Sequence, residues 1–170
     1  MVDAKHKMRE PAKFVADEMN GDLARWLRIL GYDCVYFSNG DEADERIIEL
    51  ATKQGRILLT SDSTLYKKSL RAGVEAAFTR GVARHARLAE LMKTGYIDTD
   101  LKRRLRRCTT CNALLTETER ESVSALADQR VETADDRIWV CNQCGKVYWT
   151  GSHWKGITRT LQQAAQLAGL

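Results

Sequence analysis

The chain of 170 residues contains a single proline, Pro11, and few aromatic residues, which make up 7% of the sequence. Because proline breaks helices, its scarcity leaves long helices unobstructed. No apolar run approaches the roughly 18 residues that cross a bilayer. Residues 1–13 also lack the apolar segment of a secretory signal. We therefore expect a cytoplasmic protein without a membrane partner.

Charge of one sign is not strongly in excess, since 27 basic and 23 acidic residues give a formal net charge of +4. This mildly basic balance permits a polyanionic partner without requiring one. The hydrophobic content of 44% and the charged content of 29% are typical of a soluble globular protein rather than a disordered one. The length accommodates one ordinary domain, or a domain of roughly 100 residues with a small module.

Cysteine is sparse, but its spacing is the most informative pattern in the chain. Four of the five cysteines form two Cys-x-x-Cys pairs, Cys108/Cys111 and Cys141/Cys144. Each pair presents two sulfurs on one side of a tight turn, and four thiolates complete the tetrahedral shell of one Zn²⁺ ion. In a reducing compartment this spacing favours metal over disulfides. We expect one structural zinc, and we interpret Cys34 as a small buried hydrophobe.

Short apolar runs alternate with amphipathic segments before the first cysteine pair. The predicted strands are 14–16, 34–37, 56–60 and 74–79, and the predicted helices are 22–30, 42–54, 63–72 and 83–94. This alternation is typical of an α/β fold, with a mostly parallel sheet covered by helices on both faces.

A change of composition after residue 98 indicates a second module. We expect a three-layer α/β/α domain followed by a small zinc-ribbon module. The expected division is 12–100 for the α/β domain, 101–107 for a basic connector, 108–156 for the ribbon and 157–170 for a C-terminal helix or tail.

Acidic residues follow two of the predicted strands. Asp17 and Asp62 each end a strand, and an acidic cluster opens the second predicted helix. Parallel sheets place their chemistry at the carboxyl ends of the strands. Clustered carboxylates repel one another, and Mg²⁺ or Mn²⁺ offsets that repulsion, activates water and stabilises the leaving oxygen of a phosphodiester. Alternatively, these acids are helix caps, with Asp62 before the third helix and Asp41 or Glu42 before the second.

Four motifs occur in a fixed order along the chain. They are Asp17-x-x-x-x-Asp22-Leu-Ala-Arg-Trp-Leu-Arg-x-Leu-Gly31-Tyr-Asp33, Arg56-Ile-Leu-Leu-Thr-Ser-Asp62, the two Cys-x-x-Cys pairs, and Val147-Tyr-Trp-x-Gly-Ser-His-Trp154. Together they resemble the Mut7-C family of PIN-like ribonuclease domains, which joins a PIN-type nuclease fold to a C-terminal zinc ribbon. The resemblance extends from about Phe14 to Trp154.

The resemblance implies a ribonuclease dependent on Mg²⁺ or Mn²⁺. By motif position, Asp17 matches the first-strand acid, Asp62 matches the acid after the third strand, and Asp44 is our choice for the second-helix acid. Asp41 and Glu45 are the alternates. PIN nucleases often have a further acid after the fourth strand. Here no acid follows that strand until Glu90.

Basic and aromatic residues supply the expected contacts with single-stranded RNA. Arg25 and Arg80 are expected to face phosphates, and the basic connector to follow the RNA backbone through Arg103, Arg104, Arg106 and Arg107. Trp149, His153 and Trp154 either stack on bases or pack the ribbon onto the first domain.

The preferred interpretation is that the protein hydrolyses RNA at the carboxylate-bound metal. Two alternatives stay open, namely a non-catalytic RNA-binding module and a zinc-ribbon interaction adaptor. The missing fourth acid keeps the first alternative open.

Overall fold

The computed structural model describes residues 11–38, 43–80, 83–98, 104–119 and 137–170. Its first sheet has four parallel strands in the order β2-β1-β3-β4. The strands are β1 (Lys13–Ala16), β2 (Asp33–Tyr36), β3 (Ile57–Thr60) and β4 (Ala76–Phe78). Phe14 of β1 is in register with both Cys34 of β2 and Ile57 of β3, so β1 lies inside the sheet and β2 at its edge.

Each strand of this sheet is followed by a helix, as the alternation of the sequence predicted. The helices are α1 (Gly21–Ile29), α2 (Ala43–Gln54), α3 (Ser63–Arg71) and α4 (Arg84–Lys93), and a short 3₁₀ helix, η1 (Glu18–Asn20), precedes α1. Their bounds differ from the predicted ones by one residue at most.

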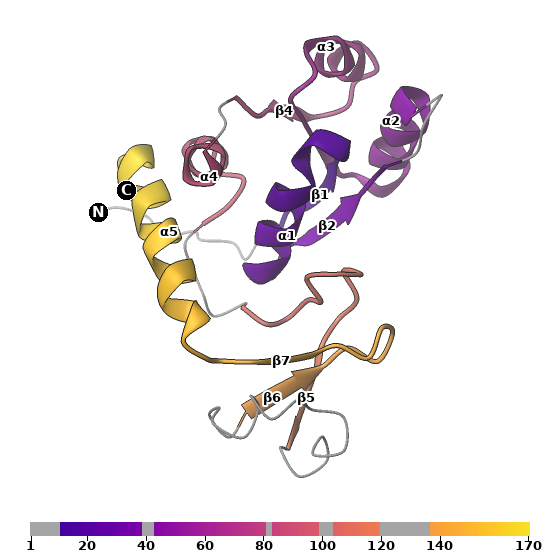
Figure 1. The fold of residues 1–170 in the computed structure, drawn as a ribbon. Helices are drawn as coiled ribbons and strands as arrows, with labels where there is room; N and C mark the ends of the chain where they lie inside the picture. The colour runs from indigo at the N-terminus through magenta and orange to yellow at the C-terminus, as the bar shows by residue number, and fades with distance from the viewer. Residues whose placement is uncertain (1–10, 39–42, 81–82, 99–103, 120–136) are drawn as a thin grey trace, which may run out of the picture.

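Two apolar cores lie on opposite faces of the sheet because side chains alternate along each strand. Phe14 belongs to the core that contains Leu23 of α1 and Leu88 of α4. Its neighbour Val15 belongs to the core that contains Ile47 of α2, together with residues of α3. Helices therefore cover both faces, and the predicted three-layer α/β/α arrangement is confirmed (Figure 1).

Beyond its first turn, the C-terminal helix α5 (His153–Ala168) packs on the first core. Its Leu161 and Ala164 are 4% and 0% exposed and join the core shared by α1 and α4. Figure 1 shows α5 beside α4. The helix begins four residues before the predicted 157, so His153 and Trp154 lie on its first turn. Among the described residues, no helix combines the length and apolarity needed to span a membrane.

A second, antiparallel sheet carries the cysteine turns. Its strands are β5 (Thr116–Glu119), β6 (Arg137–Val140) and β7 (Val147–Trp149), in that order. Ile138 is fully buried at its centre, and Val140, Val147 and Trp149 pack around it partly buried. Such a small apolar cluster stabilises little by itself, which is why a metal or docking onto a larger core is needed.

The first cysteine turn docks on the edge strand β2. The Asn112 side chain accepts a hydrogen bond from the Cys34 backbone N–H (3.1 Å) and donates one to Asp33 (2.8 Å). Buried Arg28 of α1 donates to the carbonyl oxygens of Thr109 (3.1 Å) and Thr110 (2.9 Å). The turn thereby satisfies an edge amide and fixes the ribbon against the α/β part.

Candidate active site and four-cysteine cluster

The strand order creates a topological switch point at the carboxyl ends of β1 and β3, and this strand-end position of Asp17 and Asp62 is called the crevice. From β1 the chain crosses to β2 on one side and then returns to β3 on the other, and ligands bind at such switch points. Asp17 follows β1 and is 7% exposed, and its backbone N–H donates to the carbonyl of Leu59 at 3.1 Å. Asp62 follows β3 by two residues.

Asn20, fully buried, connects three strand ends at this crevice. Its amide nitrogen donates to Asp17 Oδ1 (2.8 Å) and to Ser61 Oγ (3.3 Å). Its amide oxygen accepts from Thr79 Oγ1 at 2.9 Å. Sequence reasoning missed Asn20, Ser61 and Thr79. The available signal was a polar residue at or near the end of three predicted strands: Asn20 four residues after the first, Ser61 just after the third and Thr79 as the last residue of the fourth.

Arg87 of α4 links this network to α1. It is 9% exposed and donates to Asn20 Oδ1 (3.3 Å) and to both carboxylate oxygens of Asp22 (2.8 and 2.6 Å). Its Nε is buried and has no hydrogen-bond partner among the described residues. No local pattern could have predicted the Arg87–Asp22 pair, because 65 residues separate its members.

Asp62 is the N-cap of α3. Its Oδ1 accepts from the backbone N–H groups of Thr64 (2.6 Å) and Leu65 (3.2 Å). The capping alternative for this residue is therefore confirmed. Only one carboxylate oxygen is used in this way, so a cap and a metal ligand are not mutually exclusive roles.

Asp44 and Glu45 lie in the first turn of α2 and share a lysine from α3. Lys68 Nζ is 2.5 Å from Glu45 Oε1 and 3.7 Å from Asp44 Oδ2. The hydrogen bond from Lys68 lowers the pKa of Glu45. Asp41 lies outside the described residues.

The three predicted acids do not form one tight group of ligands in the described part of the chain. There, the only set of three or more His, Cys, Asp or Glu side chains with ligand atoms within 4.8 Å of one another is the four cysteines. Asp17 is held by Asn20, Asp62 by the α3 backbone and Asp44 by Lys68. Asp17 and Asp62 lie at the same edge of the sheet, because they follow β1 and β3, which are neighbouring parallel strands.

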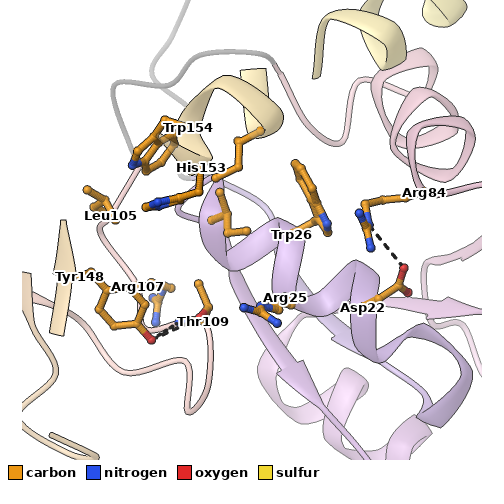
Figure 2. A pocket seen from close by; sticks show the side chains of 12 residues that line it. Asp22, Arg25, Trp26, Arg84, Leu105, Arg107, Thr109, Tyr148, His153 and Trp154 are labelled. Carbon is orange, nitrogen blue, oxygen red and sulfur yellow. Dashed lines mark hydrogen bonds and ion pairs between the residues drawn. The ribbon is translucent and has the colours of Figure 1, made fainter. Parts of the chain in front are cut away.

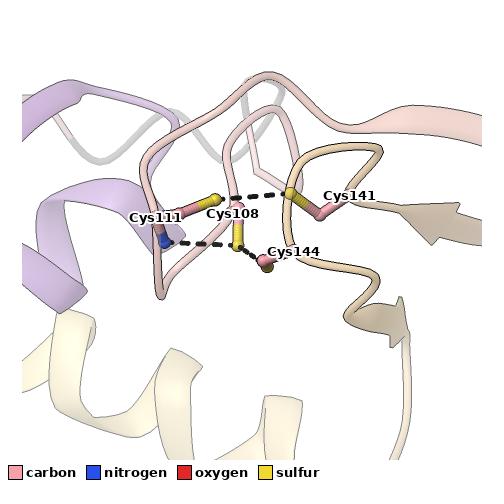
Figure 3. A group of neighbouring side chains, drawn as sticks. All are labelled: Cys108, Cys111, Cys141 and Cys144. Carbon is pink, nitrogen blue, oxygen red and sulfur yellow. Dashed lines mark hydrogen bonds between the residues drawn. The ribbon is translucent and has the colours of Figure 1, made fainter.

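The four cysteines come together as their spacing predicted (Figure 3). Cys108 Sγ lies 3.5 Å from Cys144 Sγ, and Cys111 Sγ lies 3.4 Å from Cys141 Sγ. A tetrahedral zinc with Zn–S bonds of about 2.3 Å has sulfurs about 3.8 Å apart. The cluster therefore has nearly the size of a four-thiolate metal shell. Cys34, by contrast, is fully buried away from it, as predicted.

Both cysteine turns have the same backbone conformation. The N–H of Asn112 donates to Cys108 O (3.0 Å), and that of Gly145 donates to Cys141 O (2.8 Å). These two residues have φ values of +67° and +74°. Glycine adopts this left-handed region without penalty, and asparagine tolerates it better than most residues. The symmetry of the turns brings the two sulfur pairs face to face.

Tyr148 of β7 supports the first cysteine pair. Its hydroxyl lies 3.0 Å from Cys108 Sγ and accepts from the Thr109 N–H at 3.1 Å. Burial alone would raise the pKa of the Cys108 thiol, but hydrogen bonds from Tyr148 and from nearby backbone N–H groups lower it to about 6. The thiolate is the form that binds metal.

Comparison with known protein families agrees with this combination of a strand-end crevice and a four-cysteine cluster. A model of the Mut7-C RNAse domain matches residues 12–161. The chain belongs to the Mut7-C RNAse domain family. The match confirms the resemblance inferred from the motifs and indicates a ribonuclease-type function with RNA as substrate. Comparisons with curated proteins and with solved structures gave no match.

The family match extends over both parts of this Mut7-C domain. It includes the parallel sheet, the cysteine cluster and the first half of α5, up to Leu161. Because Leu161 is buried in the core of α1 and α4, the matched segment ends inside a packed helix. The α/β part, the ribbon and the first half of α5 thus all lie within the matched segment.

The basic residues predicted to bind substrate have different surroundings in the Mut7-C domain. Arg25 and Arg106 are exposed, and their guanidinium groups have no ion pair or hydrogen bond with the described residues. Arg80 lies over the Phe78 ring at 5.3 Å. Arg103 lies outside the described residues.

Two arginines of the connector contact the protein itself. Arg104 lies over the Trp154 ring, 5.6 Å from its centroid. Arg107 is 3.2 Å from Asp33 Oδ2 and donates to Asn112 O at 2.9 Å, so it helps to dock the ribbon. A part of the basic run therefore has a structural role.

Proposed function

We propose that this Mut7-C domain is a cytoplasmic, metal-dependent ribonuclease that hydrolyses phosphodiester bonds of single-stranded RNA. The observation that carries the proposal is the position of Asp17. A buried carboxylate lies at the switch point of a parallel sheet, held by a buried amide, in a chain of an RNase family. Burial of an acid next to a crevice is typical of catalytic sites.

The donor atoms fit Mg²⁺ or Mn²⁺ held in an open shell. Asp17 and Asp62 each use Oδ1 in hydrogen bonds, and Oδ2 of each has no hydrogen bond within the described part of the chain. Mg²⁺ is commonly bound through one or two carboxylates, several waters and the phosphates of the substrate. When bound, the metal supplies charge neutralisation and a more acidic water. We keep Asp44 as the third acid, which requires its release from Lys68, with Asp41 and Glu45 as alternates.

The residues around the crevice position the acids and the substrate. Asn20 orients the Asp17 carboxylate through one 2.8 Å hydrogen bond and is itself held by Thr79 and Arg87. The buried guanidinium of Arg87 adds positive charge beside the crevice. Arg25 and Arg80 are assigned to the phosphates, and no protein nucleophile is needed for in-line attack by water.

The four-cysteine cluster is assigned to one structural Zn²⁺ ion. Four thiolates close the tetrahedral shell, so the zinc has no open position for water and takes no part in hydrolysis. Elemental analysis should give one zinc per chain, and Cys141→Ser should lose it and destabilise the ribbon sheet. A metal-free wild-type protein would rule out this assignment.

The decisive experiment measures cleavage of a labelled single-stranded RNA with Mg²⁺, Mn²⁺ or EDTA. We expect cleavage with either metal, none in EDTA, and none for Asp17→Asn. Glu49→Gln, which removes an exposed acid of α2, is the control and should cleave like the wild type. A DNA strand of the same sequence tests the choice of RNA. Intact RNA together with tight RNA binding would favour the non-catalytic module, and no RNA binding would favour the adaptor.

A further inference from the structure

A groove of about 360 Å³ lies between α1, the segment before Cys108, β7 and the start of α5. Its α1 wall is formed by Asp22, Arg25, Trp26 and Ile29, which share one helix face at intervals of three and four residues. Figure 2 shows the opposite wall, with Arg107, Tyr148, His153 and Trp154. The groove therefore exists only because the ribbon and α5 are both docked against the α/β part.

The groove has an excess of positive charge. Its one acid, Asp22, already accepts two hydrogen bonds from Arg87, and Arg84 lies 3.8 Å from it. The charge of Arg107 is partly neutralised by its ion pair with Asp33. Arg25 is exposed and has no partner among the described residues, so its charge is available to a ligand. Such an arrangement attracts an anion.

The far wall carries flat rings at the start of α5. The His153 and Trp154 rings are 5.9 Å apart and inclined at 36°, and Trp154 Nε1 donates to Trp149 O at 3.3 Å. Trp154 is half-buried, and Arg104 lies against its ring. A tryptophan held at its edge and by a neighbouring cation presents a fixed surface for stacking. An arginine that binds phosphate, opposite a ring that stacks on a base, is the combination by which proteins bind single-stranded nucleic acids.

We propose that this groove binds an unpaired nucleotide of the RNA substrate beside the crevice of Asp17. This proposal rests on the proposed function in taking RNA as the substrate. The base stacks against Trp154 and His153, and the adjoining phosphate binds Arg25. The volume is at the small end for ligand sites and suits one nucleotide rather than a folded partner.

The position of the groove allows it to guide an RNA strand to the crevice. Its Asp22 end is in the first turn of α1, five residues after Asp17. The wall from Asp22 to Ile29 extends about 10 Å along the helix axis, away from the strand ends. A strand bound in the groove therefore runs along α1 with one end at the crevice. Paired bases cannot enter, because both their faces are stacked within the duplex.

Binding is measured in EDTA, which separates the groove from any cleavage. The probe is a 5′-fluorescein-labelled 12-nucleotide RNA without secondary structure, followed by anisotropy across a range of salt concentrations. Arg25→Ala should weaken binding and reduce the slope of log affinity against log salt by about 0.7. Trp154→Ala should weaken binding about tenfold, and Trp154→Phe should restore most of it. The controls are Arg71→Ala, an exposed arginine of α3, and the same RNA as a duplex, which should bind less.

Zinc content and thermal unfolding establish that each variant is folded. The proposal is overturned if folded Arg25→Ala and Trp154→Ala bind RNA like Arg71→Ala, even when cleavage still depends on Asp17. It is also overturned if the duplex binds more tightly than the single strand. The proposed function fails separately, when the wild type binds RNA through the groove but cuts none with either metal.

Discussion

The side-chain amide of Asn20 donates a 2.8 Å hydrogen bond to the carboxylate of Asp17, three residues earlier in the chain. Both residues are buried, and the same amide also contacts Ser61, Thr79 and Arg87. A fully bonded buried amide has one allowed orientation, so the carboxylate that it holds is fixed as well. Asn20 is therefore the residue on which the geometry of the crevice depends.

Replacement of Asn20 by alanine should lower both stability and cleavage. The change leaves Thr79, Arg87 and Asp17 without a shared partner, which should reduce the free energy of unfolding by about 2–3 kcal/mol. Urea unfolding measures this loss, and RNA cleavage by the folded fraction measures the effect on Asp17. Asn142→Ala removes an exposed asparagine of the ribbon and should change neither. Equal stability of Asn20→Ala and wild type would contradict a stabilising role of this hydrogen-bond network.

Replacement of Asp33 by asparagine should destabilise the contact between the ribbon and the sheet. Asp33 accepts from Arg56 at 2.7 Å and from Asn112 at 2.8 Å, and Arg107 lies 3.2 Å away. The neutral side chain leaves the two arginines without their carboxylate. We expect a loss of about 2 kcal/mol or more in the free energy of unfolding near neutral pH. Glu49→Gln, on an exposed ion pair, should have little effect.

The same substitution has a predicted pH dependence. Burial alone would raise the pKa of Asp33, but the hydrogen bond from Arg56, with Asn112 and Arg107, holds it below the ordinary 3.8. The stabilisation is therefore complete above the unfolded pKa and is lost as the pH falls through the lower folded pKa. The difference in unfolding free energy between wild type and Asp33→Asn should be constant from about pH 5 to 7 and shrink below about pH 4. A difference that grows on acidification would contradict the assignment.

Substitutions at Asn112 should separate backbone conformation from side-chain contact. Asn112→Gly keeps the favourable left-handed backbone and loses the bonds to Cys34 and Asp33. Asn112→Ala loses the same two hydrogen bonds and also places alanine in the unfavourable left-handed region. It should therefore be about 1 kcal/mol less stable than the glycine variant. Gly145→Ala should cost a similar amount, since an added Cβ meets no atom within 4 Å and only the φ of +74° is strained. Thermal unfolding with zinc bound tests this order.

Cys34 should be the least reactive thiol of the chain. It is fully buried, and burial is the main cause that raises its pKa to about 12. After removal of metal by a chelator, we expect a thiol reagent to titrate the four clustered cysteines first. Cys34 should react only in denaturant, so the count rises from four to five on unfolding. The Cys34→Ala variant should react at four thiols under both conditions. Rapid reaction of a fifth thiol in the folded protein would contradict this burial.

The strands, the helices and the cysteine cluster were predictable because their signals are local. Apolar runs such as Ile57–Thr60 and the spacing of apolar residues on α1 depend on neighbours a few residues away. The conformation of a Cys-x-x-Cys turn is likewise determined by the few residues within it. The position of Asp17 at a strand end followed from the same pattern, and the order of the motifs indicated the family, which the match over residues 12–161 confirmed.

The surroundings of each site residue were decided by tertiary structure. Asp44 pairs with a lysine from the next helix, and Arg107 docks the ribbon instead of facing solvent. None of these partners is implied by strand or helix periodicity, because they depend on which elements become adjacent. The role of each charged side chain was therefore open until the elements were packed.

By itself, then, the sequence determined that this protein alternates strands with helices, carries acids at strand ends and has four cysteines in two Cys-x-x-Cys turns. Only the tertiary structure decided that α5 returns to the first core and that the ribbon docks on β2 through Asn112. The physical reason is range. Hydrogen bonding within turns and helices acts between near neighbours, whereas tertiary packing brings together residues such as Cys34 and Asn112, which are 78 positions apart. The groove between Arg25 and Trp154 is the result of that long-range packing.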